Sequence, residues 1–303
     1  MADRPTIPPS IPLSIPMRSW LFAPGDSDKK MAKATASDAD IVIFDLEDAV
    51  APQIKPDARL MVATALNAAD NRERLWVRIN PFETDMPLLD LAAVMSARPG
   101  GIVLPKAEGP QDVVRLDHTL SALEAAHDIP LGSTPVMALV TETAASMFEA
   151  GNYAGAPRLV AMSWGAEDLS DSIGAQANVD TSGRFDPAYE LARTLCLLGA
   201  ARAGVTAIET IQTDFRDLDG LGARAGDMRR QGFGGMLAIH PAQVEPINTA
   251  FTPGDAEIAE ARMVVKLFAD NPELGTIGHS GKMYDRPHLS RAQQLLAGLP
   301  GNR

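Results

Sequence analysis

The sequence predicts an α/β fold of the (β/α)8 class, a TIM barrel with a C-terminal helical extension. Eight short apolar runs rich in β-branched residues alternate with longer helical patterns, as expected for a parallel sheet with crossover helices. These runs end near residues 24, 47, 80, 106, 142, 168, 212 and 240. A closed barrel of about 250 residues needs roughly 31 residues per unit, which fits this spacing. No G-x-G-x-x-G motif follows the first run, which argues against an open dinucleotide-binding sheet.

Each predicted strand is an apolar run that ends at charged residues, polar residues or proline. In chain order the predicted strands are 19–23, 41–45, 75–80, 101–104, 136–142, 159–164, 206–211 and 237–240. The predicted helices among the connections include 28–37, 56–68 and 109–127. The longest connection follows the sixth strand. Its segment 171–186 has the length of a lid or a substrate loop on the active rim of a barrel.

The chain is predicted to have three segments. Residues 1–16 contain five prolines and are interpreted as an extended N-terminal arm. Residues 17–250 form the barrel, and residues 251–303 form the extension, with a helix over 254–270, a glycine-rich stretch over 275–287 and a last helix over 289–296. Because a barrel does not need this extension, we expect it to fold over the barrel mouth or to contact a neighbouring subunit.

Composition excludes several kinds of partner. The net charge of -12 argues against nucleic acid, which requires a basic face, but not against a small anion that needs only a local cluster of positive charge. No apolar run approaches the roughly 20 residues of a membrane span. The single cysteine, Cys196, excludes an internal disulfide and fits a reducing compartment. We therefore expect a cytoplasmic protein that binds neither nucleic acid nor membrane.

Charged side chains gather at the ends of the predicted strands. Active sites of barrel enzymes lie at these C-terminal ends, and a buried unpaired carboxylate would be costly elsewhere. Two acids on neighbouring strands suit Mg²⁺, which takes few protein carboxylates, and Glu142 and Asp168 are the best pair. For either acid alone, a salt bridge is the alternative interpretation. The polar residues at the strand ends are Asp45, Glu47, Asp48, Arg78, Lys106, Glu142, Asp168 and His240.

Arg78 lies inside an apolar strand, where alternation directs it to the face opposite Val77 and Ile79. An arginine that points into a barrel must be paired, either with the acids of the rim or with an anionic substrate. The alternative is a purely structural ion pair with Glu47 or Asp48. The sequence has no zinc-ligand spacing, nucleophile elbow or Walker-type loop.

Taken together, eight motifs along residues 17–297 resemble the citrate lyase beta-subunit family, which includes the malyl-CoA and citramalyl-CoA lyases. The motifs occur in the order and with the spacing of that family. They are Trp20-Leu21-Phe22-x-Pro24-x-Asp26, Asp45-Leu46-Glu47-Asp48-Ala49-Val50, Val77-Arg78-Ile79-Asn80, Leu104-Pro105-Lys106-Ala107-Glu108, Glu142-Thr143-Ala144, Trp164-Gly165-Ala166-Glu167-Asp168-Leu169, Ile239-His240-Pro241-x-Gln243 and Met283-Tyr284-Asp285-x-Pro287.

The resemblance implies a barrel enzyme that depends on Mg²⁺, with Mn²⁺ as an alternative. The reaction would cleave or form a carbon–carbon bond in a 3-hydroxyacyl-CoA such as malyl-CoA, citramalyl-CoA or citryl-CoA, giving an acyl-CoA and a small 2-oxo acid. The resemblance also implies a homotrimer or a homohexamer. The implied roles are metal binding by Glu142 and Asp168, catalysis by Arg78, Asp48, Glu47 and Asp285 (the last from a neighbouring subunit), and substrate binding by Arg78, Lys106, Gly165, Ala166 and Glu167.

Some positions depart from the family pattern and leave alternatives open. Thr141 stands where an aliphatic residue often precedes the glutamate, and both His279-Ser280-Gly281-Lys282 and the loop 171–186 are individual to this chain. These departures concern the choice of substrate more than metal binding. One alternative function is a metal-dependent aldolase of free 2-oxo acids without CoA. Another is a beta subunit that is active only within a citrate lyase complex, with an acyl-carrier partner.

Overall fold

The computed structural model describes residues 15–299, which divide into two compact units between Phe251 and Thr252. The first unit contains a closed barrel of eight parallel strands in chain order, which confirms the predicted fold class. The arm predicted for residues 1–16 lies almost entirely outside the described residues. The strands are β1 (Ser19–Pro24), β2 (Ile41–Asp45), β3 (Leu75–Arg78), β4 (Gly101–Leu104), β5 (Val136–Leu139), β6 (Leu159–Ser163), β7 (Thr206–Glu209) and β8 (Gly235–Ala238).

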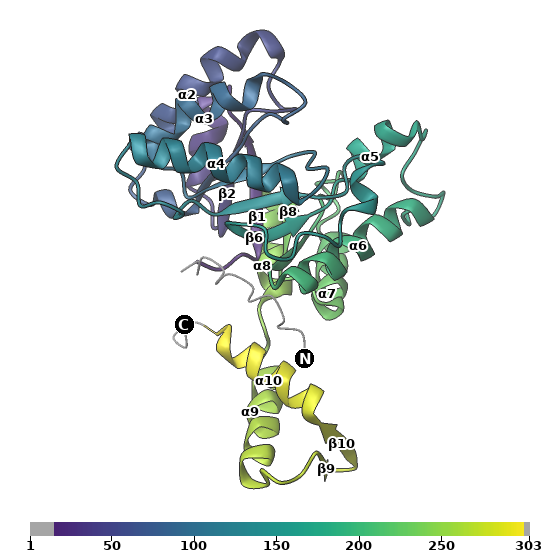
Figure 1. The fold of residues 1–303 in the computed structure, drawn as a ribbon. Coiled ribbons are helices and arrows are strands. Elements are labelled where there is room, and N and C mark those ends of the chain that lie inside the picture. The colour runs from purple at the N-terminus through teal and green to yellow at the C-terminus, as the bar shows by residue number, and fades with distance from the viewer. Residues whose placement is uncertain (1–14, 300–303) are drawn as a thin grey trace. The chain divides into compact units, whose positions relative to one another are not determined.

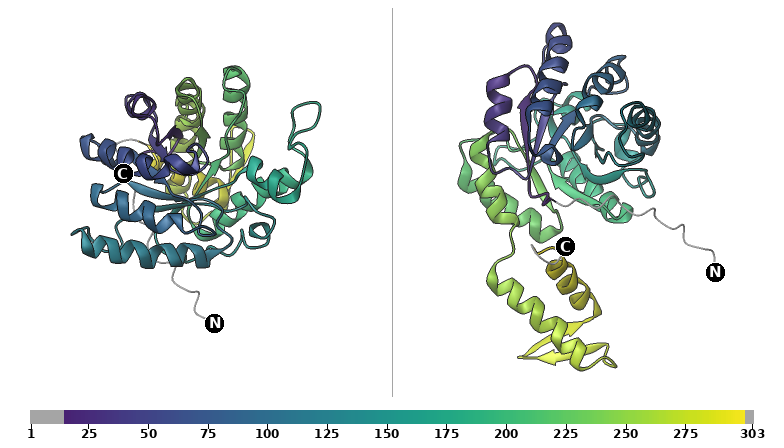
Figure 2. Two further views of the ribbon diagram at one scale, coloured as in Figure 1. Left: turned by 90° about the horizontal axis from the view of Figure 1, so that it is seen from above. Right: turned by 90° about the vertical axis from the view of Figure 1, so that its left-hand side faces the viewer.

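Helices surround these strands, as Figures 1 and 2 show for the first unit. The connection between β5 and β6 contains only the short 3-10 turn Ser146–Phe148, whereas two helices follow β6. Among the described residues, no helix combines the length and the apolar character needed to cross a membrane. The helices of this unit are α1 (Asp28–Thr35), α2 (Lys55–Ala68), α3 (Met86–Val94), α4 (Pro110–Ala126), α5 (Ala166–Ile173), α6 (Pro187–Ala203), α7 (Leu218–Gln231) and α8 (Val244–Phe251).

Strand boundaries were predicted less well than strand identities. β2 and β4 have the predicted bounds, but β3 ends at Arg78 and β5 at Leu139, both earlier than predicted. β8 runs over Gly235–Ala238, and the prediction of 237–240 was wrong by two residues at each end. A strand ends where its hydrogen-bonding neighbours end, and local apolarity does not carry that information.

The interior of the barrel is filled by side chains that alternate along each strand. On β2, Ile41 and Ile43 belong to the interior cluster; on β3, Trp76 does. Trp20 packs edge-to-face on Trp76, with the ring centroids 4.9 Å apart. Gly101, which pairs with Trp76, leaves room for its indole, because a Cβ there would lie 2.6 Å from the ring atoms. Asp45 and Arg78 continue the same alternation, so the top layer of the barrel is charged.

A second, larger apolar layer separates the strands from the helices. It is made from the opposite faces of the strands, such as Val42, Val77 and Ile102, and from the inward faces of the helices, such as Val62 and Leu120. Burial on both faces explains why the strands are near-continuous apolar runs in the sequence. The strands are therefore packed on both faces beneath the rim.

The second unit has its own small core. Helix α9 (Asp255–Asp270) and helix α10 (Arg286–Ala297) pack together, and between them lies the antiparallel hairpin of β9 (Thr276–His279) and β10 (Lys282–Asp285). The stretch predicted only as glycine-rich thus forms a hairpin, with Ser280 and Gly281 in left-handed conformations at its turn. The buried residues of this core are Ala261, Val264, Phe268, Ile277, Tyr284 and Ala292.

Candidate active site

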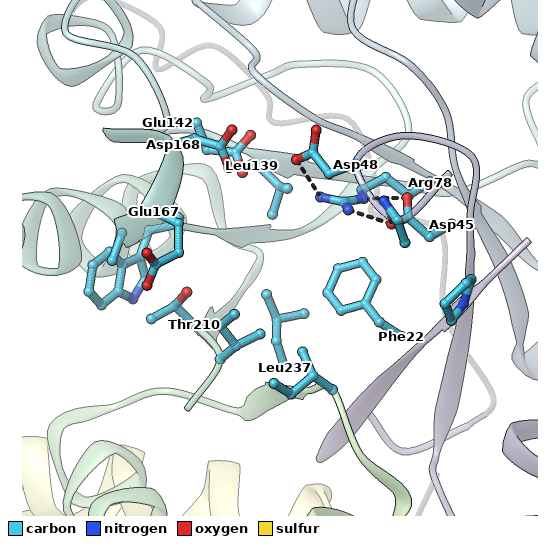
Figure 3. Close-up of a pocket in the computed structure, with 17 residues that line it drawn as sticks. Phe22, Asp45, Asp48, Arg78, Leu139, Glu142, Glu167, Asp168, Thr210 and Leu237 are labelled. Atoms are coloured by element: carbon cyan, nitrogen blue, oxygen red, sulfur yellow. Dashed lines mark hydrogen bonds and ion pairs between the residues drawn. The ribbon is translucent and has the colours of Figure 1, made fainter. Parts of the chain in front are cut away.

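A cavity of about 410 Å³ opens at the C-terminal ends of the barrel strands. Figure 3 shows Glu142 and Asp168 on one side of it and Asp45 and Arg78 on the other, with Phe22 and Leu237 among the apolar residues. Gly165, Ala166 and Glu167, which were predicted to contact substrate, also line it, as does Asp48. The tertiary structure therefore brings together most of the predicted site residues.

Arg78 is held from two directions by carboxylates. Its Nε donates to Oδ1 of Asp45 at 2.8 Å and its Nη2 to Oδ2 at 2.6 Å, while Nη1 lies 2.8 Å from Oε2 of Glu47. Asp48 is more distant, at 3.9 Å, and the Phe22 ring lies 4.7 Å from the guanidinium carbon. Burial lowers the pKa of Arg78, but the charges of Asp45 and Glu47 outweigh this and raise it well above its ordinary value. Arg78 is therefore a fixed cation.

Asp45 lines the cavity and pairs with Arg78, and sequence reasoning missed it as a candidate site residue. It was recognised as a strand end but was given no role, although it pairs with Arg78 across β2 and β3. Burial raises the pKa of Asp45, but Arg78 and two backbone N–H groups lower it by more, so the net shift is downward. The period of two along β2 places Asp45 on the same inward face as Ile41 and Ile43 and could have identified it.

Lys106 connects the two sides of the rim. Its backbone is in the left-handed region, with φ of 49°, and its N–H donates to Oε2 of Glu142 at 2.6 Å. Its Nζ lies 2.6 Å from Oε1 of Glu47, 2.8 Å from Oδ1 of Asp168 and 3.6 Å from Oδ2 of Asp48. Burial lowers the pKa of Lys106, but Glu47 and Asp168 raise it more. Lys106 lies beside the cavity and contacts four carboxylates of the rim.

Glu142 and Asp168 form a pair of carboxylates with unequal surroundings. Glu142 is 3% exposed, and Asp168, whose side chain is 24% exposed, lies in the first turn of α5. Burial raises the pKa of Glu142, and the charges of Asp168 and Glu47 raise it further. Gly165 makes this arrangement sterically possible, because a Cβ there would lie 2.7 Å from Oε1 of Glu142.

The donor set fits a hard divalent cation with few protein ligands. Among the described residues, no group of three His, Cys, Asp or Glu side chains is arranged to hold a metal. Mg²⁺ usually takes only one or two carboxylates and completes its octahedron with water and substrate oxygens. The repulsion that raises the pKa of Glu142 is the kind that a cation between it and Asp168 relieves. Two carboxylates facing an open cavity therefore fit Mg²⁺ and do not fit a structural zinc site.

The segment 174–186 after α5 contacts the wall of the cavity. Phe185 packs edge-to-face on Trp164, with centroids 5.1 Å apart, and Nδ2 of Asn178 donates to Oε1 of Glu167 at 2.8 Å. Trp164 and Glu167 line the cavity, so this segment supports its wall. His240, by contrast, stacks on Phe215 and is not among the lining residues.

Asp285 belongs to the second unit, where it is the N-cap of α10. Its Oδ1 accepts the backbone N–H of His288 at 3.3 Å and contacts the ring nitrogen Nδ1 of the same residue. The His288 ring lowers the pKa of Asp285. Asp285 thus caps the N-terminus of a helix.

The barrel and its rim define a class of protein: a barrel enzyme whose cavity has a largely buried arginine, paired with Asp45 and Glu47, on one side and the carboxylates of Glu142 and Asp168 on the other. The family model for HpcH/HpaI aldolase/citrate lyase matches residues 18–241, which is more than two thirds of the chain. The chain belongs to this family and is an enzyme of the carbon–carbon lyase class.

Relatives and solved structures agree with this membership. The (3S)-malyl-CoA thioesterase of Cereibacter sphaeroides is 35% identical over 285 residues, covering 93% of this chain and 94% of that protein. Citrate lyase subunit beta of Haemophilus influenzae is 32% identical over 285 residues, covering 92% and 95%. The crystal structure of CitE from Mycobacterium tuberculosis with magnesium, acetoacetate and coenzyme A has a TM-score of 0.77 at 34% identity, covering 94% of this chain and 98% of that chain.

Proposed function

We propose that this protein cleaves or forms the carbon–carbon bond of a 3-hydroxyacyl-CoA such as malyl-CoA, citramalyl-CoA or citryl-CoA, with Mg²⁺ held by Glu142 and Asp168. The products of cleavage would be an acyl-CoA and a 2-oxo acid. The observation that carries the proposal is the position of these two carboxylates across one cavity from a largely buried arginine that is paired with two other carboxylates. The relative named as a malyl-CoA thioesterase and the neighbour solved with magnesium and coenzyme A support the same substrate class.

When bound, Mg²⁺ would polarise the oxygens of the acid half of the substrate. Cleavage removes the proton of the 3-hydroxyl, converts that carbon to a carbonyl and leaves the electron pair of the broken bond on the thioester as an enolate. A guanidinium has five N–H donors, and Asp45 and Glu47 engage only part of them, so Arg78 retains donors for the enolate oxygen. Lys106, Gly165, Ala166 and Glu167 would position the substrate, and Asp48 would line the site.

We further propose that Asp285 of a neighbouring subunit moves the proton as acid and base, in a homotrimer or homohexamer. The second unit carries Asp285 on its own folded core, which suits a module that contacts another subunit. The single cysteine fits the cytoplasm as the compartment.

The deciding assay offers the purified chain malyl-CoA, citramalyl-CoA and citryl-CoA with Mg²⁺ or with EDTA. Release of acyl-CoA together with a 2-oxo acid, abolished by EDTA, is the expected result. Free CoA with an intact hydroxy acid would instead indicate a thioesterase. Cleavage of free hydroxy acids would indicate the CoA-independent aldolase, and activity restored only by an acyl-carrier protein would indicate the obligate subunit.

The metal assignment is tested by Glu142→Ala and Asp168→Ala. We expect each variant to keep its fold and to lose Mg²⁺ binding and lyase activity, because too few donors remain. Calorimetry measures the Mg²⁺ affinity and circular dichroism checks the fold. The matched control is Asp171→Ala, which removes an exposed carboxylate one turn further along α5 and should change neither. Unchanged Mg²⁺ affinity in both site variants would remove these residues from the metal site.

A further inference from the structure

Lys55, the first residue of α2, is a buried lysine outside the cavity. Its side chain reaches under the loop that follows β2, and the residue is 7% exposed. Its Nζ donates to the carbonyl oxygens of Leu46 and Glu47 at 2.8 Å each and to Oδ1 of Asn80 at 2.5 Å. An ammonium has three N–H donors, so these three neutral oxygens satisfy it completely. The ion pairs of the described residues include none with Lys55.

The same loop is held from its other face by Asp45. The carbonyl of the Leu46–Glu47 peptide points to Lys55, and the N–H of this peptide donates to Oδ1 of Asp45 at 2.9 Å. The N–H of Ala49 donates to Oδ2 of Asp45 at 3.1 Å. A cation on the carbonyl side and an anion on the N–H side both match the dipole of this peptide, so they hold it in one orientation.

Asp45 is also the bidentate partner of Arg78, so an unbroken series of contacts connects Lys55 with Arg78. Charges alternate from Lys55 through the peptide of Leu46–Glu47 to Asp45 and then to Arg78. The side chain of Glu47, carried by this peptide, contacts both Arg78 and Lys106. The orientation of one loop therefore sets the positions of three charged groups at the rim.

The charge of Lys55 is balanced by Asp90, to which it is connected through Asn80. Asn80, which accepts from Lys55, donates through its Nδ2 and its backbone N–H to Oδ2 of Asp90, both at 2.7 Å. Asp90 is fully buried and accepts a further hydrogen bond from Nε of Arg59 at 2.7 Å. A buried ammonium needs such compensation, because an isolated buried charge is very unfavourable.

We infer that Lys55 is a positioning residue of the active site: it orients the Leu46–Glu47 peptide, and through it places the Asp45–Arg78 pair at the cavity and the Glu47 carboxylate against Arg78 and Lys106. The expected effect of Lys55 on catalysis rests on the proposed function. The expected effect of Lys55 on the orientation of the loop does not. Lys55 contacts neither the cavity nor any group proposed to bind metal.

The test compares Lys55→Met with Arg59→Met, two variants of α2 that each replace a buried cation by a neutral chain of similar length. Both residues reach Asp90, Lys55 through Asn80 and Arg59 directly, but only Lys55 contacts the loop. Loss of a supporting contact around an active site typically costs about 10–100-fold in activity. We therefore expect Lys55→Met to lower kcat by about that factor with little change in KM, and Arg59→Met to lower Tm while keeping kcat.

A crystal structure of Lys55→Met gives a readout that does not depend on activity. We expect a turned Leu46–Glu47 peptide and a displaced Glu47 carboxylate, with the barrel strands in place. A loop in its original position, together with normal kcat per folded molecule, would overturn the inference. Lys55→Gln, which keeps a short N–H donor, replaces Lys55→Met if that variant does not fold. If the wild-type chain cleaves no hydroxyacyl-CoA, the proposed function fails, and the crystal structure still decides the role of Lys55.

Discussion

At the scale of single residues, Arg78 is a paired group for which we also propose a catalytic role. Asp45 and Glu47 hold it, so the alternative of a structural ion pair is present in the fold, although with Asp45 as the principal partner rather than Glu47 or Asp48 alone. Pairing does not exclude a catalytic role, because a cation that is already oriented needs no reorganisation when charge develops on the substrate.

Arg78→Lys separates these two contributions. We expect kcat to fall by about 10²–10³, or roughly 3–4 kcal/mol, because one ammonium cannot keep Asp45 and Glu47 and also meet an enolate. Steady-state kinetics and a melting curve measure the two effects. The control is Arg158→Lys, at a buried arginine that pairs with Glu124 at the start of β6, where we expect a lower Tm and normal kcat. A large loss of Tm with near-normal kcat in Arg78→Lys would make Arg78 structural.

Gly165 is required by its neighbour rather than by its own backbone. Its φ of -126° suits any residue, but a Cβ would lie 2.7 Å from Oε1 and 2.8 Å from Cγ of Glu142. In Gly165→Ala the carboxylate must move, so we expect about a tenfold loss of Mg²⁺ affinity with the fold intact. Calorimetry measures it. Gly222→Ala on α7, where a Cβ meets nothing within 4 Å, is the control, and equal Mg²⁺ affinity in both variants would contradict this account.

At the scale of elements, Glu124 attaches α4 to the start of two strands. Its carboxylate accepts from Arg158 at 2.6 and 2.9 Å, from the N–H of Gly132 at 2.7 Å and from the N–H of Thr134 at 3.0 Å. Burial raises the pKa of Glu124, but Arg158 and the other donors lower it more, so the net shift is downward. This cluster lies at the N-terminal ends of β5 and β6, away from the rim.

The lowered pKa of Glu124 makes its contribution to stability depend on pH. A carboxylate with a folded pKa below its unfolded value of about 4.3 stabilises the fold above that pH, and the stabilisation is lost as the pH falls through the folded value. We expect Glu124→Gln to melt below wild type at pH 7, with a difference that shrinks below about pH 4. Glu245→Gln, at an exposed residue of α8, should show no such difference. A gap in Tm that persists unchanged in acid would refute the assignment.

At the scale of the whole molecule, the second unit carries the proposed acid and base. Its core of α9, α10 and the hairpin is built from its own residues, and Asp285 is fixed there as a helix N-cap. Asn is also a good N-cap, so Asp285→Asn should keep this structure while losing the ionisable group.

Subunit mixing tests action between subunits. Asp285→Asn and Arg78→Ala are each expected to be inactive, whereas mixed oligomers should regain activity because an intact barrel meets an intact second unit. Native mass spectrometry confirms mixing, and the lyase assay measures recovery. The control mixes Asp285→Asn with a subunit that carries both substitutions, so that no subunit of the oligomer has an intact Asp285. No recovery in confirmed mixed oligomers would indicate that Asp285 acts within its own subunit or not at all.

The sequence by itself determined the order of the strands, the closure of eight of them and the rim on which the charged residues gather. These features follow from local periodicity and from the rule that parallel strands share one functional end. β2 and β4 were located to the residue because their apolar runs are bounded sharply by polar residues or proline.

Only the tertiary structure decided how the charges pair. The choice of Asp45 as the principal partner of Arg78 depends on the register of β2 against β3, and the bridging position of Lys106 depends on its left-handed backbone. The buried contact of Lys55 with the loop depends on the packing of α2, and the hairpin of the second unit depends on pairing across a turn. Each of these features depends either on contacts between segments that are separated in the chain or on a single backbone angle. Hydrophobic periodicity contains no information about either.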